Sequence, residues 1–142
     1  MEFMRIAIDQ AKLSDGDIPV GAIIVKDGKI IAKACNKREK DNDITSHAEI
    51  LAIRQAAKDL GNWRLEDCEL YVTLEPCPMC GWAILQSRLK SVYFGSYDIN
   101  YGAFSSNIDL RKISSSKIEV YGGLLETECD KLLETFFKKI RS

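Results

Sequence analysis

The sequence contains no stretch of apolar residues long enough to cross a lipid bilayer, which takes about 20 residues in a helix. Residues 1–5 also lack the basic region and the apolar stretch that begin a secretory signal. These two absences argue against a membrane protein and against an exported one. We therefore expect no membrane partner and a cytoplasmic location.

A surplus of charge is missing as well, because 20 Lys and Arg residues against 21 Asp and Glu residues give a formal net charge of −1. Proteins that bind nucleic acids usually carry a basic surplus, so any basic surface in this chain must be local. The candidates are residues 111–112 and the C-terminal run 138–141. Composition alone favours a simpler interpretation of both, as solvated surface.

Histidine is scarce: the chain has one, His47, and five cysteines. In a reducing compartment, closely spaced cysteines more often bind a metal or act in catalysis than form disulfides. Cys77 and Cys80 are such a pair. The other cysteines, at positions 35, 68 and 129, stand among apolar residues and are predicted to be core residues.

The chain shows no repeat, low-complexity segment or linker, and its length predicts one domain, residues 1–142, with one core. Apolar periodicity and turn residues predict strands at 20–25, 30–34, 69–74, 89–94 and 117–121, and helices at about 3–13, 47–60, 77–86 and 129–140. Asp27-Gly28, between the first two strands, is typical of a hairpin turn. Residues 95–116 are rich in Ser, Asn and Gly and receive no assignment.

A hairpin followed by alternating helices and strands predicts an α/β fold with a mixed sheet, antiparallel at its start and parallel later. The helix that begins at His47 runs away from its starting point, and the strand 69–74 runs back. The chain then turns at Pro76 and begins a new helix at Cys77. Both helices should therefore begin at the carboxyl end of this strand, where open α/β sheets usually build their sites.

The residues expected at this end are the parts of a catalytic zinc site. His47, Cys77 and Cys80 offer an imidazole and two thiolates, and three protein ligands leave the fourth tetrahedral position to water. The partial positive charge of a helix N-terminus favours thiolate over thiol. Glu49, two residues after the histidine, could move protons at the water without binding the metal. The pattern predicts an enzyme that splits water.

Each half of this pattern has another explanation. Residues 46–49 fit a capping box, in which Glu49 reaches back to the Ser46 N–H. Residues 77–80 fit a redox pair of thioredoxin type, although His47 then has no role. A closed structural zinc site would need a further cysteine as its fourth ligand. Together the halves form the known signature of zinc nucleobase deaminases, H-x-E followed by P-C-x-x-C, which is far more specific than either half.

The sequence resembles the tRNA-specific adenosine deaminases of bacteria, within the wider cytidine deaminase-like superfamily, over most of its length. Beyond the two zinc motifs, the resemblance covers residues 18–22, 36–38, 62–65, 70–75, 87–88, 94–95 and 136–137. It implies a three-layer cytidine deaminase-like fold, with a mixed central sheet of about five strands and helices on both faces. It also implies a homodimer and a tRNA anticodon stem-loop as the substrate.

The resemblance gives the zinc-site residues the same roles, three as Zn²⁺ ligands and the carboxylate as proton shuttle. It also implies contacts with the substrate elsewhere in the chain. Asn36 would hydrogen-bond a flipped-out nucleoside, Val20 would pack against its base, and the Ala48 backbone would line the pocket. Asp98 would belong to a substrate loop, and Phe137 to a closing helix that borders the RNA. For Val20 and Phe137, apolar periodicity and burial are an equally good explanation.

The loop after Asp98 departs from the pattern of the resemblance. Asn100 stands where many relatives carry a lysine, and Phe104 and Ser105 replace small residues. Trp82 follows the second zinc cysteine, where relatives often have a small residue. A charge lost at Asn100 would weaken a phosphate contact, and such contacts dominate affinity for nucleic acids.

We therefore expect a zinc-dependent hydrolytic deaminase that converts wobble-position adenosine in a tRNA anticodon loop to inosine. Two other functions stay open at this point. The departures after Asp98 also fit a small-molecule deaminase acting on guanine, cytosine or a nucleoside. The third candidate is a catalytically silent zinc module that only binds RNA. An intact Glu49 argues against it, because binding alone needs no proton shuttle.

Overall fold

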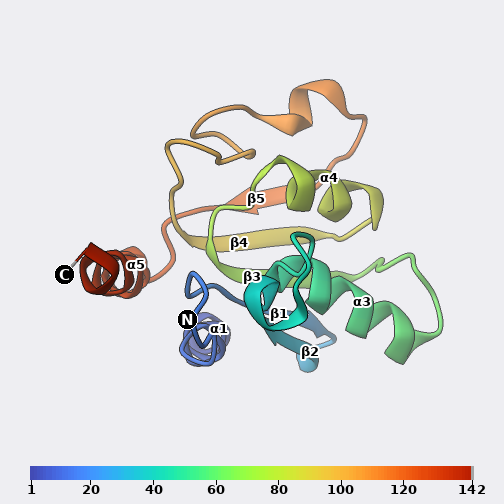
Figure 1. Ribbon diagram of the computed structural model, residues 1–142. Coiled ribbons are helices and arrows are strands. Elements are labelled where there is room, and N and C mark those ends of the chain that lie inside the picture. Colours follow the sequence, from blue (N-terminus) through green and yellow to red (C-terminus); the bar gives the residue numbers. More distant parts are fainter. Residues whose placement is uncertain (142) are drawn as a thin grey trace.

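The computed structural model describes residues 1–141 (Figure 1). Within them, strands pair into a sheet of order β2-β1-β3-β4-β5. The strands are β1 (Gly21–Lys26), β2 (Lys29–Cys35), β3 (Cys68–Leu74), β4 (Ser91–Ser96) and β5 (Glu119–Tyr121). β1 pairs antiparallel with β2 and with β3, whereas the pairs β3–β4 and β4–β5 are parallel. The predicted mixed sheet is confirmed.

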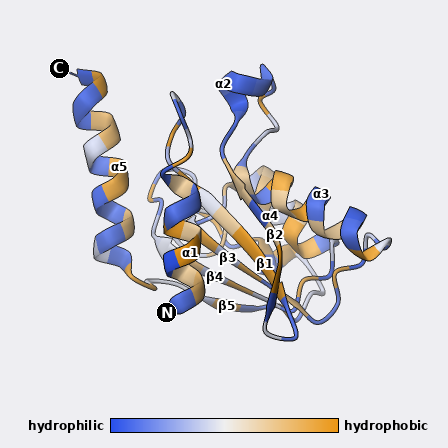
Figure 2. Cartoon of the chain, turned by 90° about the horizontal axis from the view of Figure 1, so that it is seen from below, coloured by the Kyte–Doolittle hydropathy of each residue, from blue (hydrophilic) through white to orange (hydrophobic). Residues whose placement is uncertain are grey.

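Helices cover both faces of this sheet, which confirms the three-layer fold (Figure 2). The helices are α1 (Glu2–Ala11), α2 (Arg38–Asp41), α3 (Ala48–Leu60), α4 (Pro78–Gln86) and α5 (Glu126–Arg141). On one face, Ala52 of α3 and Ile84 of α4 belong to the same buried cluster as Leu70 and Val72 of β3. On the other face, residues of α1 form a second buried cluster with Cys129 of α5, and Tyr71 of β3 packs against it. No helix within residues 1–141 has both the length and the apolar character to cross a membrane.

The hairpin between β1 and β2 turns as its sequence predicts. Asp27 and Gly28 have φ angles of 51° and 76°, the left-handed conformation that a two-residue hairpin turn requires at both positions. β1 is almost entirely buried because it lies inside the sheet between β2 and β3. Its apolar residues therefore form a continuous run rather than an alternating one.

Some boundaries differ from the predicted ones. The segment expected as a loop between residues 36 and 45 contains α2, whose four residues are all charged, so no apolar periodicity could reveal it. The fourth strand begins at Ser91, because Arg88 adopts a φ of 66° in the preceding turn. The unassigned stretch 95–116 contains a short 3₁₀ helix, η1 (Leu110–Ile113), and a bridge between Phe104 and Asp109.

The closing helix α5 forms where predicted, but the protein covers little of its apolar stripe. Among its described residues, Cys129 alone is fully buried. Phe137 and Ile140, near the end of the helix, are 41% and 63% exposed. Figure 2 shows α5 at the outer side of the layer that it shares with α1. The sequence pattern thus predicts the helix correctly without revealing how much of its apolar side stays in contact with solvent.

Candidate zinc and active site

The histidine and the paired cysteines meet beyond the carboxyl end of β3. His47 is the N-cap residue of α3, Cys77 is the N-cap residue of α4, and Cys80 lies in the first turn of α4. The His47 Nδ1 atom lies 3.4 Å from Cys80 Sγ and 3.8 Å from Cys77 Sγ. Ligands about 2.0–2.3 Å from a tetrahedral zinc ion stand roughly 3.5 Å apart, so the three side chains fit one ion.

The electrostatics of the two cysteines favour one thiolate before any ion binds. A hydrogen bond from the Cys80 thiol is the largest influence on Cys77. Burial opposes ionisation, but further hydrogen bonds from His47 and the Cys80 N–H lower the pKa of Cys77 to about 4. The Cys80 thiol donates this hydrogen bond to Cys77 and is thereby held in its protonated form. Burial and the nearby Glu49 add to this effect, so the pKa of Cys80 is raised.

Glu49 lies in the first turn of α3 and is only 4% exposed. Burial raises the pKa of Glu49 to about 7, although a hydrogen bond from its own N–H opposes this shift. The carboxyl group also contacts the Cys80 thiol, so the side chain is turned toward the cysteines. A carboxyl group with a pKa near neutrality can both accept and donate a proton at physiological pH.

The capping-box interpretation of residues 46–49 is wrong. The Ser46 N–H donates to the Asp43 carbonyl oxygen at 3.1 Å, and the Ser46 hydroxyl donates to Asp41 Oδ2 at 2.9 Å. Glu49 therefore has no role in capping Ser46. Asp41 at the end of α2 and Asp43 in the following loop satisfy the serine, and this leaves the glutamate free to face the metal-binding group.

The other two interpretations of the cysteines fit the geometry poorly. A thioredoxin-type pair leaves the histidine idle, whereas His47 lies within hydrogen-bond reach of both sulfur atoms. A closed zinc site would need a further cysteine as its fourth ligand. The metal-binding group found among residues 1–141 holds one histidine and two cysteines, whose ligand atoms lie within 4.8 Å of one another.

Asn36 connects the start of β1 to the start of α3. Its Nδ2 donates to the Ile18 carbonyl oxygen at 3.0 Å, and its Oδ1 accepts from the Ala48 N–H at 2.8 Å. The first N–H of α3, which has no partner inside the helix, is thereby satisfied. Val20 and Ala48 are buried, and the Val20 carbonyl oxygen accepts a hydrogen bond from the Asn36 N–H at 3.1 Å. These three residues of the predicted substrate site thus lie beside the metal-binding group at the base of α3.

The other two predicted substrate residues, Asp98 and Phe137, line one cavity of about 370 Å³. The cavity lies between the loop after β4, the end of β3 and helix α5. Its lining residues are Ile18, Leu74, Tyr97, Asp98, Ile99, Asn100, Tyr101, Leu133 and Phe137. Val20, Asn36 and Ala48 do not line it. Ile18, whose carbonyl oxygen accepts the bond from Asn36, connects the two groups of residues.

Phe104, one of the departures after Asp98, is fully buried rather than facing outward. A Cβ atom added to Gly81 of α4 would lie 3.7 Å from the Phe104 ring, which shows how closely the loop and the helix approach. Ser105, by contrast, is exposed. The larger side chain at position 104 therefore fills the core beneath the loop.

Sequence reasoning missed the structural role of Glu75. It names this residue only as part of the stretch 70–75. Glu75 is buried, and its carboxylate accepts hydrogen bonds from the backbone of Asp98, Phe104 and Ser106. The available signal is an acidic residue directly before Pro76-Cys77, next to a predicted metal ligand.

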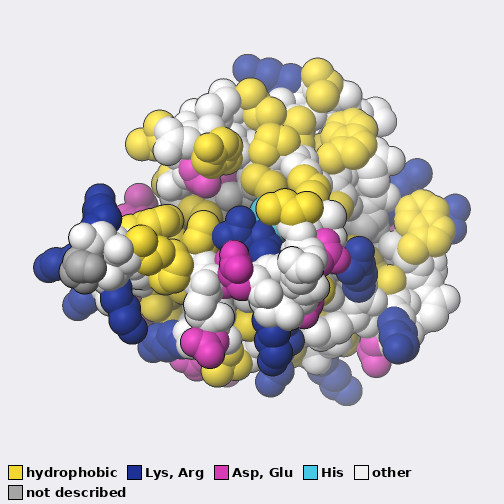
Figure 3. All heavy atoms as spheres, in the orientation of Figure 1, with side chains coloured by type: hydrophobic (Ala, Val, Ile, Leu, Met, Phe, Trp, Pro, Cys, Tyr) yellow, Lys and Arg dark blue, Asp and Glu magenta, His cyan; other side chains and the backbone are white. Residues whose placement is uncertain are grey.

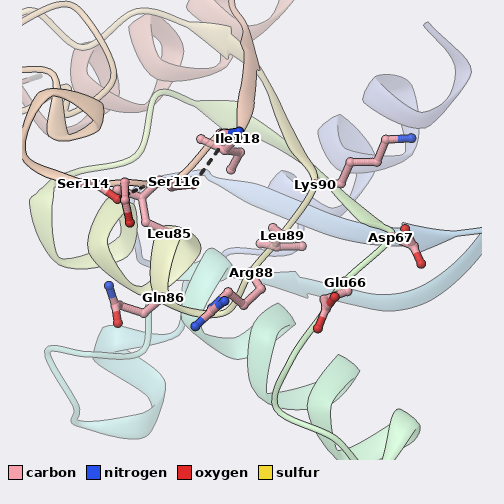
Figure 4. Close-up of a pocket in the computed structure, with 12 residues that line it drawn as sticks. Glu66, Asp67, Leu85, Gln86, Arg88, Leu89, Lys90, Ser114, Ser116 and Ile118 are labelled. Atoms are coloured by element: carbon pink, nitrogen blue, oxygen red, sulfur yellow. Dashed lines mark hydrogen bonds between the residues drawn. The ribbon is translucent and has the colours of Figure 1, made fainter.

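A larger hollow, of about 500 Å³, lies at the other end of the sheet (Figure 4). Asp67 and Lys90, which directly precede β3 and β4, line it together with Glu66 and Arg88. It is therefore at the amino ends of the parallel strands, and none of the predicted site residues lines it.

The face that carries the predicted site is partly apolar. Figure 3 shows a small cyan area of the histidine side chain between hydrophobic and basic side chains. Exposed apolar residues near the two cysteines in the chain or in the loop after Asp98 include Met79, Trp82, Ile99 and Tyr101. His47 itself is partly buried, and part of its side chain is exposed on this face.

Comparison with known proteins agrees with this geometry. Residues 1–96 match the family described as the cytidine and deoxycytidylate deaminase zinc-binding region. The chain is 43% identical to the tRNA-specific adenosine deaminase of Bacillus subtilis (strain 168) over 98% of this chain and 89% of that protein. It is 44% identical to the tRNA-specific adenosine deaminase of Aquifex aeolicus (strain VF5) over 99% of this chain and 95% of that protein.

Solved structures show the same likeness. One, from a study of A-to-I editing by tRNA:A34 deaminases at the wobble position of transfer RNA, has a TM-score of 0.86 and 39% identity, and covers 93% of this chain and 99% of its own. The guanine deaminase from Bacillus subtilis has a TM-score of 0.65 and 38% identity, and covers 75% of this chain and 80% of its own. The chain therefore belongs to the zinc-binding cytidine and deoxycytidylate deaminase family and, within it, to the tRNA-specific adenosine deaminases.

Proposed function

We propose that this protein is a zinc-dependent hydrolytic deaminase that converts wobble-position adenosine in a tRNA anticodon loop to inosine. One observation supports the chemistry above all others. His47, Cys77 and Cys80 converge within 4.8 Å, and the buried Glu49 is turned toward them. Membership of the tRNA-specific adenosine deaminases supports the choice of substrate.

His47, Cys77 and Cys80 would hold the zinc ion. An imidazole and two thiolates are donors that zinc prefers, and a three-ligand set is typical of catalytic rather than structural sites. When bound, zinc supplies a Lewis acid that lowers the pKa of water toward neutrality. The lowered pKa of Cys77 means that one of the two thiolates is available at neutral pH.

Glu49 performs the proton transfers of the reaction. Its carboxylate takes a proton from the attacking water and delivers it to N1 of adenine, while the water oxygen adds to C6. Glu49 then takes the remaining proton from the new C6 hydroxyl group and delivers it to the amino group, which leaves as ammonia while the C6 carbonyl of inosine forms. Its burial supports this role, since burial raises the pKa of Glu49 to about 7 and so allows both transfers near neutrality.

The substrate contacts that we propose fall into two groups. Asn36 hydrogen-bonds the flipped-out nucleoside. Its Nδ2 carries two hydrogens, of which one is donated to the Ile18 carbonyl oxygen at 3.0 Å and the other is offered to the nucleoside. Val20 and the backbone of Ala48 form the wall against the base. Asp98 and Phe137 serve the surrounding RNA, a role that the cavity between them supports.

We further propose that residues 1–142 act as one domain, and that the protein works as a homodimer in the cytoplasm. A continuous sheet with core clusters on both faces supports one domain. Exposed Met79 and Trp82 on α4 support an interface between copies, because contiguous exposed apolar side chains often mark such contacts. The cytoplasmic location follows from the proposed tRNA substrate.

Incubation of the zinc-loaded protein with an anticodon stem-loop RNA tests this function. One RNA carries adenosine at the wobble position, and a matched RNA carries adenosine only elsewhere in the loop. Free guanine, cytosine, cytidine and adenosine are assayed in parallel, and inosine and ammonia are measured. We expect inosine from the first RNA alone. Turnover of guanine without inosine would instead favour a guanine deaminase, the activity of the Bacillus subtilis structure named above.

A further inference from the structure

Glu75 is a buried acidic residue that the proposed mechanism does not use. It directly follows β3 and is 1% exposed. The ion pairs found within residues 1–141 do not include it. A buried carboxylate without a cation must be satisfied by hydrogen-bond donors, so the source of its donors indicates what it organises.

All of these donors come from the loop of residues 98–106. Glu75 Oε1 accepts from the Asp98 N–H at 3.1 Å. Glu75 Oε2 accepts from the Phe104 and Ser106 N–H groups, both at 3.1 Å. The Ser106 hydroxyl also donates to Oε1. Backbone N–H groups in a loop lack the regular partners that a helix or a sheet provides. This one carboxylate serves as the acceptor for three of them.

The loop is shaped to approach this carboxylate closely. A Cβ atom added to Gly102 would collide with the Glu75 carboxyl group and with the Asp98 carbonyl oxygen. The Gly102 N–H donates to the Asp98 carbonyl oxygen at 2.7 Å, and the Ala103 N–H donates to the Pro76 carbonyl oxygen at 2.9 Å. The loop therefore folds around Glu75 and Pro76.

The outer side of the same loop faces the proposed RNA site. Asp98, Asn100 and Tyr101 line the cavity of about 370 Å³ opposite Leu74 and Phe137. Its inner side is held by Glu75, two residues before the zinc ligand Cys77. A single short segment of chain therefore fixes a metal ligand and one wall of the cavity relative to each other.

We propose that Glu75 is the positioning residue of the RNA-binding loop 98–106. It does not touch the substrate, and it acts by holding the loop backbone in the conformation that receives the anticodon stem-loop. This role rests on the proposed function and deepens it. It also explains how the loop stays in place although its residues depart from the sequence pattern of relatives at Asn100, Phe104 and Ser105.

The test is Glu75→Gln in the full chain loaded with zinc. Glutamine keeps the volume but turns an NH₂ group toward N–H donors, so part of the loop loses its acceptor. We expect KM for the stem-loop RNA to rise roughly tenfold, the loss expected when a buried donor loses its partner. The value of kcat should change by less than about threefold, because the reacting groups are untouched. Zinc content should equal that of the wild type.

Amide hydrogen exchange provides a readout that does not depend on activity. The amides of Asp98, Phe104 and Ser106 should exchange faster in Glu75→Gln, whereas amides of β1 should be unchanged. Glu66→Gln is the matched control, since it makes the same change at an exposed residue that lines the hollow at the other end of the sheet. It should change KM by less than about twofold.

A second variant covers the case in which Glu75→Gln fails to fold. Gly102→Ala pushes the loop away from Glu75 while the carboxylate stays intact, and it should produce the same rise in KM with normal zinc content. Wild-type exchange rates at the three amides, or an unchanged KM, would overturn the role of Glu75. Failure of the wild-type protein to form inosine would overturn the proposed function instead, so the two failures are distinguishable.

Discussion

At the scale of single residues, the position of Glu49 fits the proton-shuttle role that we propose for it. Its carboxyl group is buried and contacts the Cys80 thiol, yet it is not part of the three-residue metal-binding group. Glu49→Gln should therefore lower kcat by roughly 10³-fold or more, in the range of a lost general acid–base group, and retain one zinc ion per chain. Steady-state kinetics with metal analysis on the same sample measure both properties.

His47→Ala is the contrasting variant, because it removes a proposed zinc ligand and should lose zinc and activity together. A Glu49→Gln protein that loses zinc in parallel with turnover would contradict the division of labour between shuttle and ligands. The same result would place Glu49 among the groups that hold the metal.

Asn36 has a structural duty in addition to its proposed contact with the nucleoside. Asn36→Ala leaves the buried Ala48 N–H and the Ile18 carbonyl oxygen without their partner. The free energy of unfolding should fall by about 2 kcal/mol, from the cost of unsatisfied buried polar groups. Urea unfolding of the zinc-loaded protein measures this change.

Asn62→Ala serves as the control for Asn36, because its Oδ1 accepts a hydrogen bond from the Arg64 N–H at an exposed site. It should change the free energy of unfolding by less than about 0.5 kcal/mol. Equal stability of the two variants would show that the Asn36 bonds contribute nothing measurable.

At the scale of elements, hydrogen bonds to the carboxylate of Asp17 connect the segment before β1 to helix α2. Burial opposes ionisation of Asp17, but hydrogen bonds from Arg38, Glu39 and Ile18 outweigh it and lower its pKa below 3.8. A lowered pKa in the folded state stabilises the protein above the unfolded-state pKa, and this stabilisation is lost as the pH falls through the folded-state value.

Asp17→Asn should therefore lower Tm at pH 7, and the difference in Tm from the wild type should shrink below about pH 4. Melting curves of both proteins across this pH range provide the measurement. The comparison between two proteins cancels any loss of zinc in acid that both share. A difference that stays constant down to pH 3 would contradict the charged role of Asp17.

The elements also show what the sequence can and cannot predict. β1 and α3 were predictable because apolar runs and periodicity record burial in the chain itself. The loop 98–106 was not, since its conformation depends on donors to Glu75, a residue distant in sequence. The sequence also did not reveal where the Glu49 side chain points, because this depends on the hydrogen bonds that Ser46 makes with Asp41 and Asp43.

At the scale of the whole molecule, the proposed homodimer depends on apolar side chains that one chain leaves exposed. Trp82 on α4 is 41% exposed. If it lies in the interface, Trp82→Glu should convert the dimer, of twice 16.0 kDa, into a monomer, because buried tryptophans often dominate interface energy. Sedimentation equilibrium measures this mass.

Trp63→Ala is the matched control, since Trp63 is also exposed but packs its ring against the Arg64 guanidinium, 4.4 Å from the ring centroid. This variant should keep the mass of the wild type. A wild-type protein that sediments as a monomer at all concentrations would contradict the dimer, and the cavity beside α5 would then have to bind RNA within one chain.

The ratio of kcat/KM for the wobble-adenosine stem-loop to kcat/KM for free guanine tests the central claim most directly. A zinc site with a proton shuttle can deaminate either substrate, so only the contacts made by the walls of the site can discriminate between them. We expect a ratio above roughly 10³, the discrimination available when polar and shape contacts are specific to one substrate. Turnover of guanine that exceeds turnover of the RNA would contradict a tRNA adenosine deaminase.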